Sequence, residues 1–114
     1  MKVQLLTFPG CPNADAARNT LRAVLAWMGI VLLIEEVNLD SPETPEHLRG
    51  WGSPTVLIDG VDVAGGEPSG LGCRLYRDEE GRVHTGPTPA QLRKALSRAP
   101  LLHASRTASA PDRR

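Results

Sequence analysis

The chain has 114 residues, a length that suits one domain and leaves little room for a second. Its 13 Lys and Arg residues balance its 13 Asp and Glu residues, and this zero net charge argues against nucleic acid as the main partner. No apolar run approaches the roughly 20 residues that span a bilayer, so no membrane partner is expected. The chain enters a strand-like pattern directly, without the apolar core and cleavage site of a signal peptide, so the expected location is the cytoplasm.

The first forty residues predict a strand, a helix and a second strand. Residues 3–8 form a short apolar run before a Pro-Gly pair, which is typical of a buried strand. Pro12 suits the first position of the helix that follows, in which apolar residues recur at steps of three and four as far as Gly29, the expected end. Residues 31–39 then read as a second buried strand, parallel to the first.

Turn signals predict the next elements. Residues 41–50 contain two Ser/Thr-Pro starts and a glycine stop, so one short helix is expected there. Residues 55–58 and 61–64 should pair as a hairpin, because the Asp-Gly dipeptide between them is a strong signal for a two-residue turn.

A small ribbon of residues 73–77 and 82–84 and a last helix, opened by the capping box of residues 88–91, complete the predicted elements. From residue 99 onward the Ser, Ala, Pro and Arg composition has no periodicity. We therefore expect one α/β domain over residues 1–98, in which helices flank both faces of a four-stranded mixed sheet, and a flexible tail over residues 99–114.

The two cysteines are the candidates for chemistry. Cys11 is expected at the N-cap of the first helix, where unpaired N–H groups and the helix dipole favour the thiolate form, the alternative being a buried and inert cysteine. Cys73 closes the glycine-rich loop of residues 65–72, which follows the hairpin and should lie at the same end of the sheet. Cys73 is either a second thiol of this site or merely buried at the start of the ribbon, and the sequence leaves both open.

The runs around Cys11 and Pro54 resemble the thioredoxin-like superfamily. Its members place a cysteine at the start of the first helix and a cis-proline before the strand that opens the second half of the fold. Here Phe-Pro-Gly-Cys-Pro-Asn-Ala is similar to the cysteine turn, and Ser-Pro-Thr-Val-Leu-Ile-Asp-Gly to the strand and turn, within a resemblance over residues 2–98. It implies a βαβ-(α)-ββα fold with Cys11 as the reactive thiol. In the leading hypothesis Cys11 attacks a disulfide or is oxidised by a peroxide, Cys73, which the loop brings to this end of the sheet, resolves the product, and an external dithiol reduces the pair.

The resemblance also implies the residues that bind the substrate, namely Pro12, Ser53, Pro54 and Thr55. Pro54 would shape a groove beside Cys11, where neighbouring backbone groups can pair with an extended substrate segment. The expected substrate is a protein or small-molecule disulfide or a peroxide. No cofactor is expected, and the histidines lack the spacing of a metal site.

Two alternatives remain open. Ala14 stands where thioredoxins have the second cysteine of Cys-x-x-Cys, which supports a binding module without catalysis. The chain also resembles small bacterial thioredoxin-family proteins that share Gly-Cys-Pro, Ser-Pro-Thr-Val-Leu-Ile-Asp-Gly and Cys-Arg-Leu-Tyr, some of which are labelled alkylmercury lyase. That label implies a protein that holds a soft metal or an organomercurial with both thiols, with Asp15 as proton donor.

The remaining polar and aromatic residues are interpreted as structural. Trp27 is expected in the core or at its rim, and Trp51 beside the cysteine site. Asp59 and Asp62 are expected in turns, and Arg74 is expected to be a charge that faces solvent.

Overall fold

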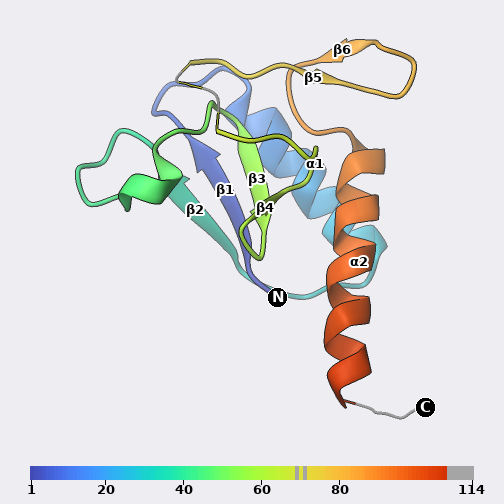
Figure 1. Ribbon diagram of the computed structural model, residues 1–114. Coiled ribbons are helices and arrows are strands. Elements are labelled where there is room, and N and C mark those ends of the chain that lie inside the picture. Colours follow the sequence, from blue (N-terminus) through green and yellow to red (C-terminus); the bar gives the residue numbers. More distant parts are fainter. Residues whose placement is uncertain (69, 71, 108–114) are drawn as a thin grey trace.

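The computed structural model describes residues 1–68, 70 and 72–107, the last nine of these by their backbone alone. Strands β1 (Val3–Thr7), β2 (Ile34–Asn38), β3 (Thr55–Ile58) and β4 (Val61–Asp62) form one sheet in the order β2-β1-β3-β4 (Figure 1). β1 pairs parallel with β2 and antiparallel with β3, and β3 pairs antiparallel with β4. The predicted four-stranded mixed sheet is therefore confirmed.

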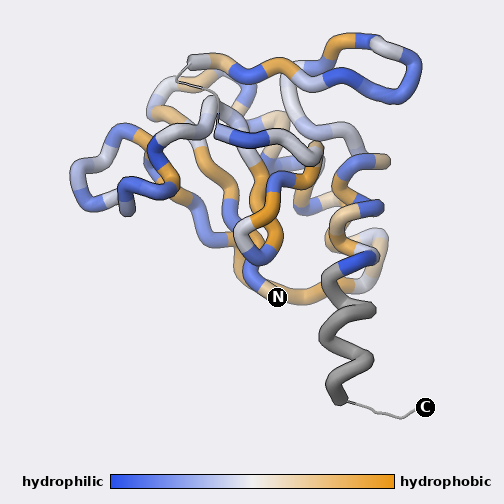
Figure 2. The backbone as a smooth tube through the Cα atoms, in the orientation of Figure 1, coloured by the Kyte–Doolittle hydropathy of each residue, from blue (hydrophilic) through white to orange (hydrophobic). Residues whose placement is uncertain are grey.

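Both α-helices, α1 (Ala14–Trp27) and α2 (Pro89–Thr107), pack on one face of this sheet, and the helix that covers the other face is only a short 3₁₀-helix. Side chains alternate along the central strands, so one set of apolar residues meets the helices and the other set faces the opposite side. Figure 2 shows these apolar strands inside the molecule. The helical face buries Val3, Leu5, Ala17, Leu21, Val24, Leu25, Val56, Ile58, Val63, Leu92 and Leu96.

The opposite face is covered by a short 3₁₀-helix, η1 (Glu46–Leu48), and by Trp51. Within residues 41–50 the predicted short helix forms only over Glu46–Leu48, because side chains ahead of it bind the backbone in place of helical bonds. Ser41 Oγ accepts a hydrogen bond from Glu43 N at 3.2 Å, and Thr44 Oγ1 donates to Asn38 O at 2.5 Å. Such local bonds compete with helical ones.

Helix α1 ends as predicted at Gly29, which has a φ of 71°. Gly29 N donates to Ala26 O and Ile30 N donates to Leu25 O, the two bonds of a Schellman motif. Trp27, expected in the core or at its rim, is instead 76% exposed. It lies in the last turn of α1, where the guanidinium of Arg93 stands 5.6 Å from its ring centre.

The second strand is an edge strand, and the prediction that residues 31–39 are buried is wrong. Val31 and Leu33 are 99% and 94% exposed. The strand begins only at Ile34, which pairs with Val3, and Val37 is its one buried member. As an edge strand, β2 meets the helical layer through Ile34, which packs against the core, and through the bonds of Glu36 to Arg18 of α1, so it buries few side chains.

The ribbon and the last helix follow the predicted order. β5 (Tyr76–Arg77) pairs with β6 (Val83–His84), and the capping box at the start of α2 is confirmed by reciprocal bonds between Thr88 and Gln91. The backbone of α2 continues past residue 98, where the sequence predicts the start of the flexible tail; residues 108–114 of that tail lie outside the described residues. Over the described chain, no helix has the length and apolar character to cross a membrane.

Candidate thiol site

Cys11 lies in the turn that joins β1 to α1. Its N–H donates to Phe8 O at 3.1 Å and its carbonyl accepts a bond from Ala14 N at 3.3 Å. The N-cap of α1 is Asn13, whose carbonyl accepts the helical bond of Ala17 N. Cys11 is therefore not the N-cap, as the sequence predicts, but stands two residues before it, and its side chain is half-buried.

Ser53 ties this turn to the start of β3. Its Oγ accepts a hydrogen bond from Phe8 N at 3.2 Å, and its peptide bond to Pro54 is cis. Thr55 Oγ1 donates to Gly52 O at 2.7 Å. Three of the predicted substrate-binding residues, Ser53, Pro54 and Thr55, are fully buried, so their side chains do not line an open groove.

The segment of residues 72–76, which we call the strap, runs along Ser53. Ser53 N donates to Gly72 O at 2.9 Å and Arg74 N donates to Ser53 O at 2.8 Å, so that Ser53 and Cys73 form a parallel bridge. In Figure 1 the strap crosses the same end of the sheet as the turn after β1. The predicted position of Cys73 at the Cys11 end of the sheet is thus confirmed.

Side chains of the strap alternate between solvent and the protein. Cys73 and Leu75 are exposed, whereas Arg74 is largely covered and Tyr76 is buried. Tyr76 Oη donates a hydrogen bond to Pro54 O at 2.5 Å, and burial raises the pKa of this phenol so that it stays protonated. The strap therefore presents the Cys73 side chain to solvent, while Tyr76 holds the strap against Pro54.

Arg74 and Asp62 form an ion pair beneath the strap. Arg74 Nη1 and Nη2 donate to the two carboxylate oxygens of Asp62 at 3.0 and 2.5 Å. Burial is the largest single effect on the pKa of Arg74 and lowers it, but the hydrogen bonds to Asp62 and the electrostatic interactions with Tyr76 and Asp62 together outweigh burial, so the pKa is raised. The predictions that Arg74 faces solvent and that Asp62 belongs to a turn are therefore wrong. Asp62 is a buried member of β4, and Asp59 alone is the turn residue, with a φ of 50°.

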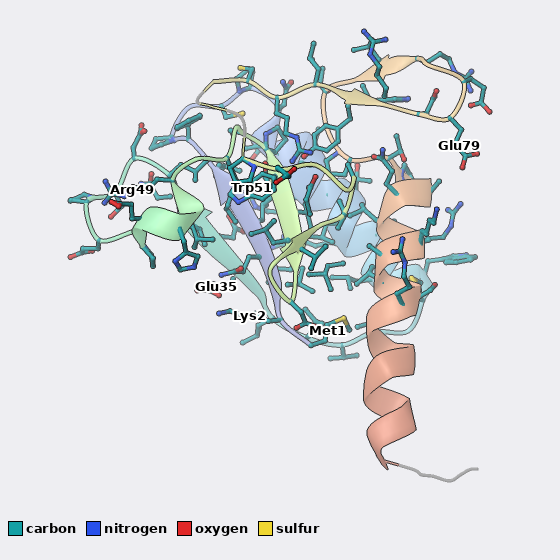
Figure 3. All side chains as sticks on the ribbon, in the orientation of Figure 1. Met1, Lys2, Glu35, Arg49, Trp51 and Glu79 are labelled. Atoms are coloured by element: carbon teal, nitrogen blue, oxygen red, sulfur yellow. The ribbon has the colours of Figure 1, made fainter. Side chains whose placement is uncertain are left out.

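Aromatic rings complete the surroundings of this pair. The guanidinium carbon of Arg74 lies 4.3 Å from the ring centre of Tyr76 and 5.5 Å from that of Trp51, distances at which a cation is attracted to the ring face. Figure 3 shows Trp51 toward the strap end of the sheet, with Lys2 and Glu35 toward the other end. Trp51, which was expected beside the cysteine site, thus contacts Arg74, the residue that follows Cys73.

No family model, curated protein or solved structure matches the chain. The site therefore has to be interpreted from its own residues.

The glycines around Trp51 give the strap its place. A Cβ on Gly52 would lie 3.0 Å from Gly72 O and 3.2 Å from Arg74 Cβ, and one on Gly50 would lie 2.9 Å from Pro68 Cβ. These separations are shorter than ordinary van der Waals contacts. The two glycines therefore allow the chain to approach more closely than any other residue would.

Four further residues shape this site without having been predicted to do so, namely Gly50, Gly52, Arg74 and Tyr76. Two signals point to them. Glycines on either side of a buried tryptophan are typical of a close backbone approach. In the Cys-Arg-Leu-Tyr run, a strand-like alternation places Arg74 and Tyr76 on one side and the cysteine on the other.

The acid assigned to the organomercurial alternative lies in an ion pair on the surface. Asp15 is exposed on the first turn of α1, and its carboxylate accepts a hydrogen bond from Arg18 at 2.6 Å. Arg18 also bonds to both carboxylate oxygens of Glu36 and lowers the pKa of that residue. Within the described part of the chain, no group of three or more His, Cys, Asp or Glu side chains could hold a metal ion.

Proposed function

We propose that this chain is a thiol–disulfide oxidoreductase of thioredoxin-like fold, with Cys11 as the reactive thiol and Cys73 as the resolving thiol. The observation that carries the proposal is the shared position of the two cysteines around Ser53. Cys73 pairs with the backbone of Ser53, and Ser53 Oγ binds Phe8, whose carbonyl anchors Cys11 N. The backbones of both cysteines are thus tied to one residue, and two free thiols at the same end of the sheet are candidates to form and break a disulfide.

The order of elements supports the fold named in the proposal. The β1-α1-β2 unit forms the parallel half, and β3, β4 and α2 form the antiparallel half. Cys11 precedes the helix of the first half, and Pro54 precedes the first strand of the second half. This is the arrangement that the resemblance to thioredoxin-like proteins implies.

The proposed cycle balances in atoms and electrons. The Cys11 thiolate attacks one sulfur of a substrate disulfide, forms a mixed disulfide and releases the first thiolate. The Cys73 thiolate then attacks the Cys11 sulfur and releases the second thiolate. An external dithiol reduces the Cys11–Cys73 disulfide and is itself oxidised. With a peroxide, the Cys11 thiolate would attack one oxygen, break the O–O bond and release an alcohol or water, leaving a sulfenic acid on Cys11. The Cys73 thiol would then convert the sulfenic acid to the same disulfide with loss of water. A reducing compartment such as the cytoplasm suits this cycle.

The test is intact mass after differential alkylation of protein treated with a mild oxidant and then with a dithiol. The expected oxidised product is a monomer that has lost two hydrogens and takes up no alkylating agent, and the dithiol should restore two alkylated thiols. Cys73→Ser should accumulate a mixed disulfide on Cys11, whereas Cys11→Ser should form neither product. Two thiols that stay free in the wild-type chain would refute the proposal.

The same samples separate the alternatives. Tight binding of one mercuric ion per chain without any disulfide formation would favour a protein that holds soft metals. A chain that neither exchanges disulfides nor binds mercury would favour a binding module without catalysis.

A further inference from the structure

We propose that the strap restricts the thiol site to low-molecular-weight disulfides and excludes extended polypeptides. This inference rests on the proposed function and names the class of its substrate. Extended peptides bind proteins by adding a strand to a backbone edge that has free N–H and C=O groups. The backbone of Ser53 lies beside the Cys11 turn, where a peptide strand could pair with it, but the strap already pairs with this backbone.

The backbone groups around Ser53 are bonded within the chain. Ser53 N donates to Gly72 O, and Ser53 O accepts from Arg74 N. Pro54 has no N–H, and its carbonyl accepts a hydrogen bond from the hydroxyl of Tyr76. A peptide that paired here would first have to displace the strap.

Displacing the strap would disturb three fixed contacts. The guanidinium of Arg74 would leave the buried carboxylate of Asp62, and an unpaired buried carboxylate is strongly unfavourable. Tyr76 would leave its buried bond to Pro54. The close fit over Gly52, where a Cβ would lie only 3.0 Å from Gly72 O, would also be lost. The strap is therefore a fixed part of the fold.

A small disulfide has no such requirement, since thiolate attack needs only access to the sulfur atom. Cys73 is exposed and Cys11 is half-buried, so small molecules can reach them without a backbone edge. For each turnover the two thiols give two electrons to the small disulfide R–S–S–R, which leaves as two molecules of the thiol R–SH, and the external dithiol restores both cysteines.

The experiment compares two disulfides that share a leaving group. One is hydroxyethyl disulfide, and the other is a flexible peptide whose central cysteine carries mercaptoethanol. Each rate constant for reaction with the reduced protein is divided by the rate constant for reaction of the same disulfide with free cysteine, so that differences in the intrinsic reactivity of the two disulfides cancel. The normalised rate constant should be about tenfold larger for the small disulfide. The peptide is slower because it can pair with Ser53 only after the two hydrogen bonds between Ser53 and the strap are broken.

Gly52→Ala is the variant that disturbs the strap, because its new methyl would press on Gly72 and Arg74. In this variant the normalised rate constants for the small disulfide and for the peptide should lie closer together than in the wild-type chain. Gly86→Ala is the matched control, since a Cβ there meets its neighbours at ordinary distances of 3.6 Å or more, and it should keep the wild-type ratio. In the wild-type chain, the amide hydrogens of Ser53 and Arg74 should exchange slowly, a measurement that does not depend on the variant folding.

The outcomes distinguish the two proposals. Equal normalised rates for both disulfides in the wild-type chain would overturn the exclusion of peptides and leave the oxidoreductase function standing. Rapid exchange of the Ser53 and Arg74 amides would overturn the exclusion as well. A chain that reacts with neither disulfide would overturn the proposed function, and this inference with it.

Discussion

The guanidinium of Arg74 donates two hydrogen bonds to the carboxylate of Asp62, from Nη1 to Oδ1 at 3.0 Å and from Nη2 to Oδ2 at 2.5 Å. The Asp62 side chain is 0% exposed and that of Arg74 is 17% exposed. Arg74 Nη1 also donates to Thr55 Oγ1 at 3.1 Å. One side chain thus connects the residue after Cys73 to β4 and to the start of β3, and the position of the second thiol depends on it.

Asp62→Asn should lower the free energy of unfolding by about 3 kcal/mol, because it leaves the covered charge of Arg74 without its counter-ion. Urea unfolding followed by circular dichroism measures this change. The double variant Asp62→Leu with Arg74→Met should recover a large part of the loss, since it removes both charges together.

The control for this prediction is Arg77→Ala, on the exposed side of β5. It should change the stability by less than about 0.5 kcal/mol, as is usual for surface positions. A loss for Asp62→Asn as small as that of the control would show that the ion pair contributes little.

Tyr76→Phe should cost about 1 to 2 kcal/mol, because it leaves the buried carbonyl of Pro54 without a donor while the ring stays in place against Arg74. The measurement is again urea unfolding, with Leu75→Ala on the exposed side of the strap as the comparison. The amide of Ser53 should also exchange faster in Tyr76→Phe than in the wild-type chain. Unchanged stability and exchange would contradict the role of this bond as a fastening of the strap.

Local signals predicted the parts of the fold that depend on neighbouring residues. The hairpin at Asp59 forms because Asp-Gly adopts the positive φ values that a two-residue turn requires. Thr88 and Gln91 cap α2 because their side chains reach each other's backbone N–H across one turn. Residues 31–33 were predicted to belong to a buried strand, but they precede β2, and Val31 and Leu33 are exposed. The composition of a short apolar run does not report which distant elements cover it.

The candidate site was predicted only in outline, for the same reason. The hairpin predicts Cys73 at the correct end of the sheet, since its returning strand leaves the chain there. The pairing of Arg74 with Asp62 joins residues twelve positions apart on two different elements, and no local pattern reports it. The exact start of α1 was also missed, because Pro12 and Asn13 are both compatible with a helix N-terminus.

Leu21→Ala and Trp27→Ala should differ sharply in stability although both residues lie on α1. Leu21 is 0% exposed in the core beneath the helices, and its truncation should cost about 3 kcal/mol. Trp27 is 76% exposed, and its loss should cost about 1 kcal/mol or less, mostly through its contact with Arg93. Urea unfolding of both variants measures the difference. A cost for Trp27→Ala equal to that of Leu21→Ala would restore the prediction that this tryptophan belongs to the core.

The turn between β5 and β6 should lose its order in acid, because Asp78 organises it. His84 Nε2 lies 2.9 Å from Asp78 Oδ2, and the amides of Glu80 and Arg82 donate to Asp78 Oδ1 at 3.0 and 2.9 Å. The bond with His84, followed by these amides and Arg82, lowers the pKa of Asp78 to about 2. A carboxyl group whose pKa is lowered by folding stabilises the fold above its ordinary pKa of 3.8 and loses that contribution as the pH falls toward 2.

Titration of the Glu80 and Arg82 amide resonances by NMR tests this expectation. Both should keep their positions from neutral pH to well below the ordinary pKa of an aspartate, and then shift together as Asp78 takes up its proton. In Asp78→Asn the shared transition near pH 2 should vanish, because the carboxyl group that accepts from both amides is gone and the amide oxygen that replaces it accepts a weaker bond. A midpoint at or above 3.8 in the wild-type chain would mean that the bonds to Asp78 do not favour its charged form, and would contradict its role in holding the turn.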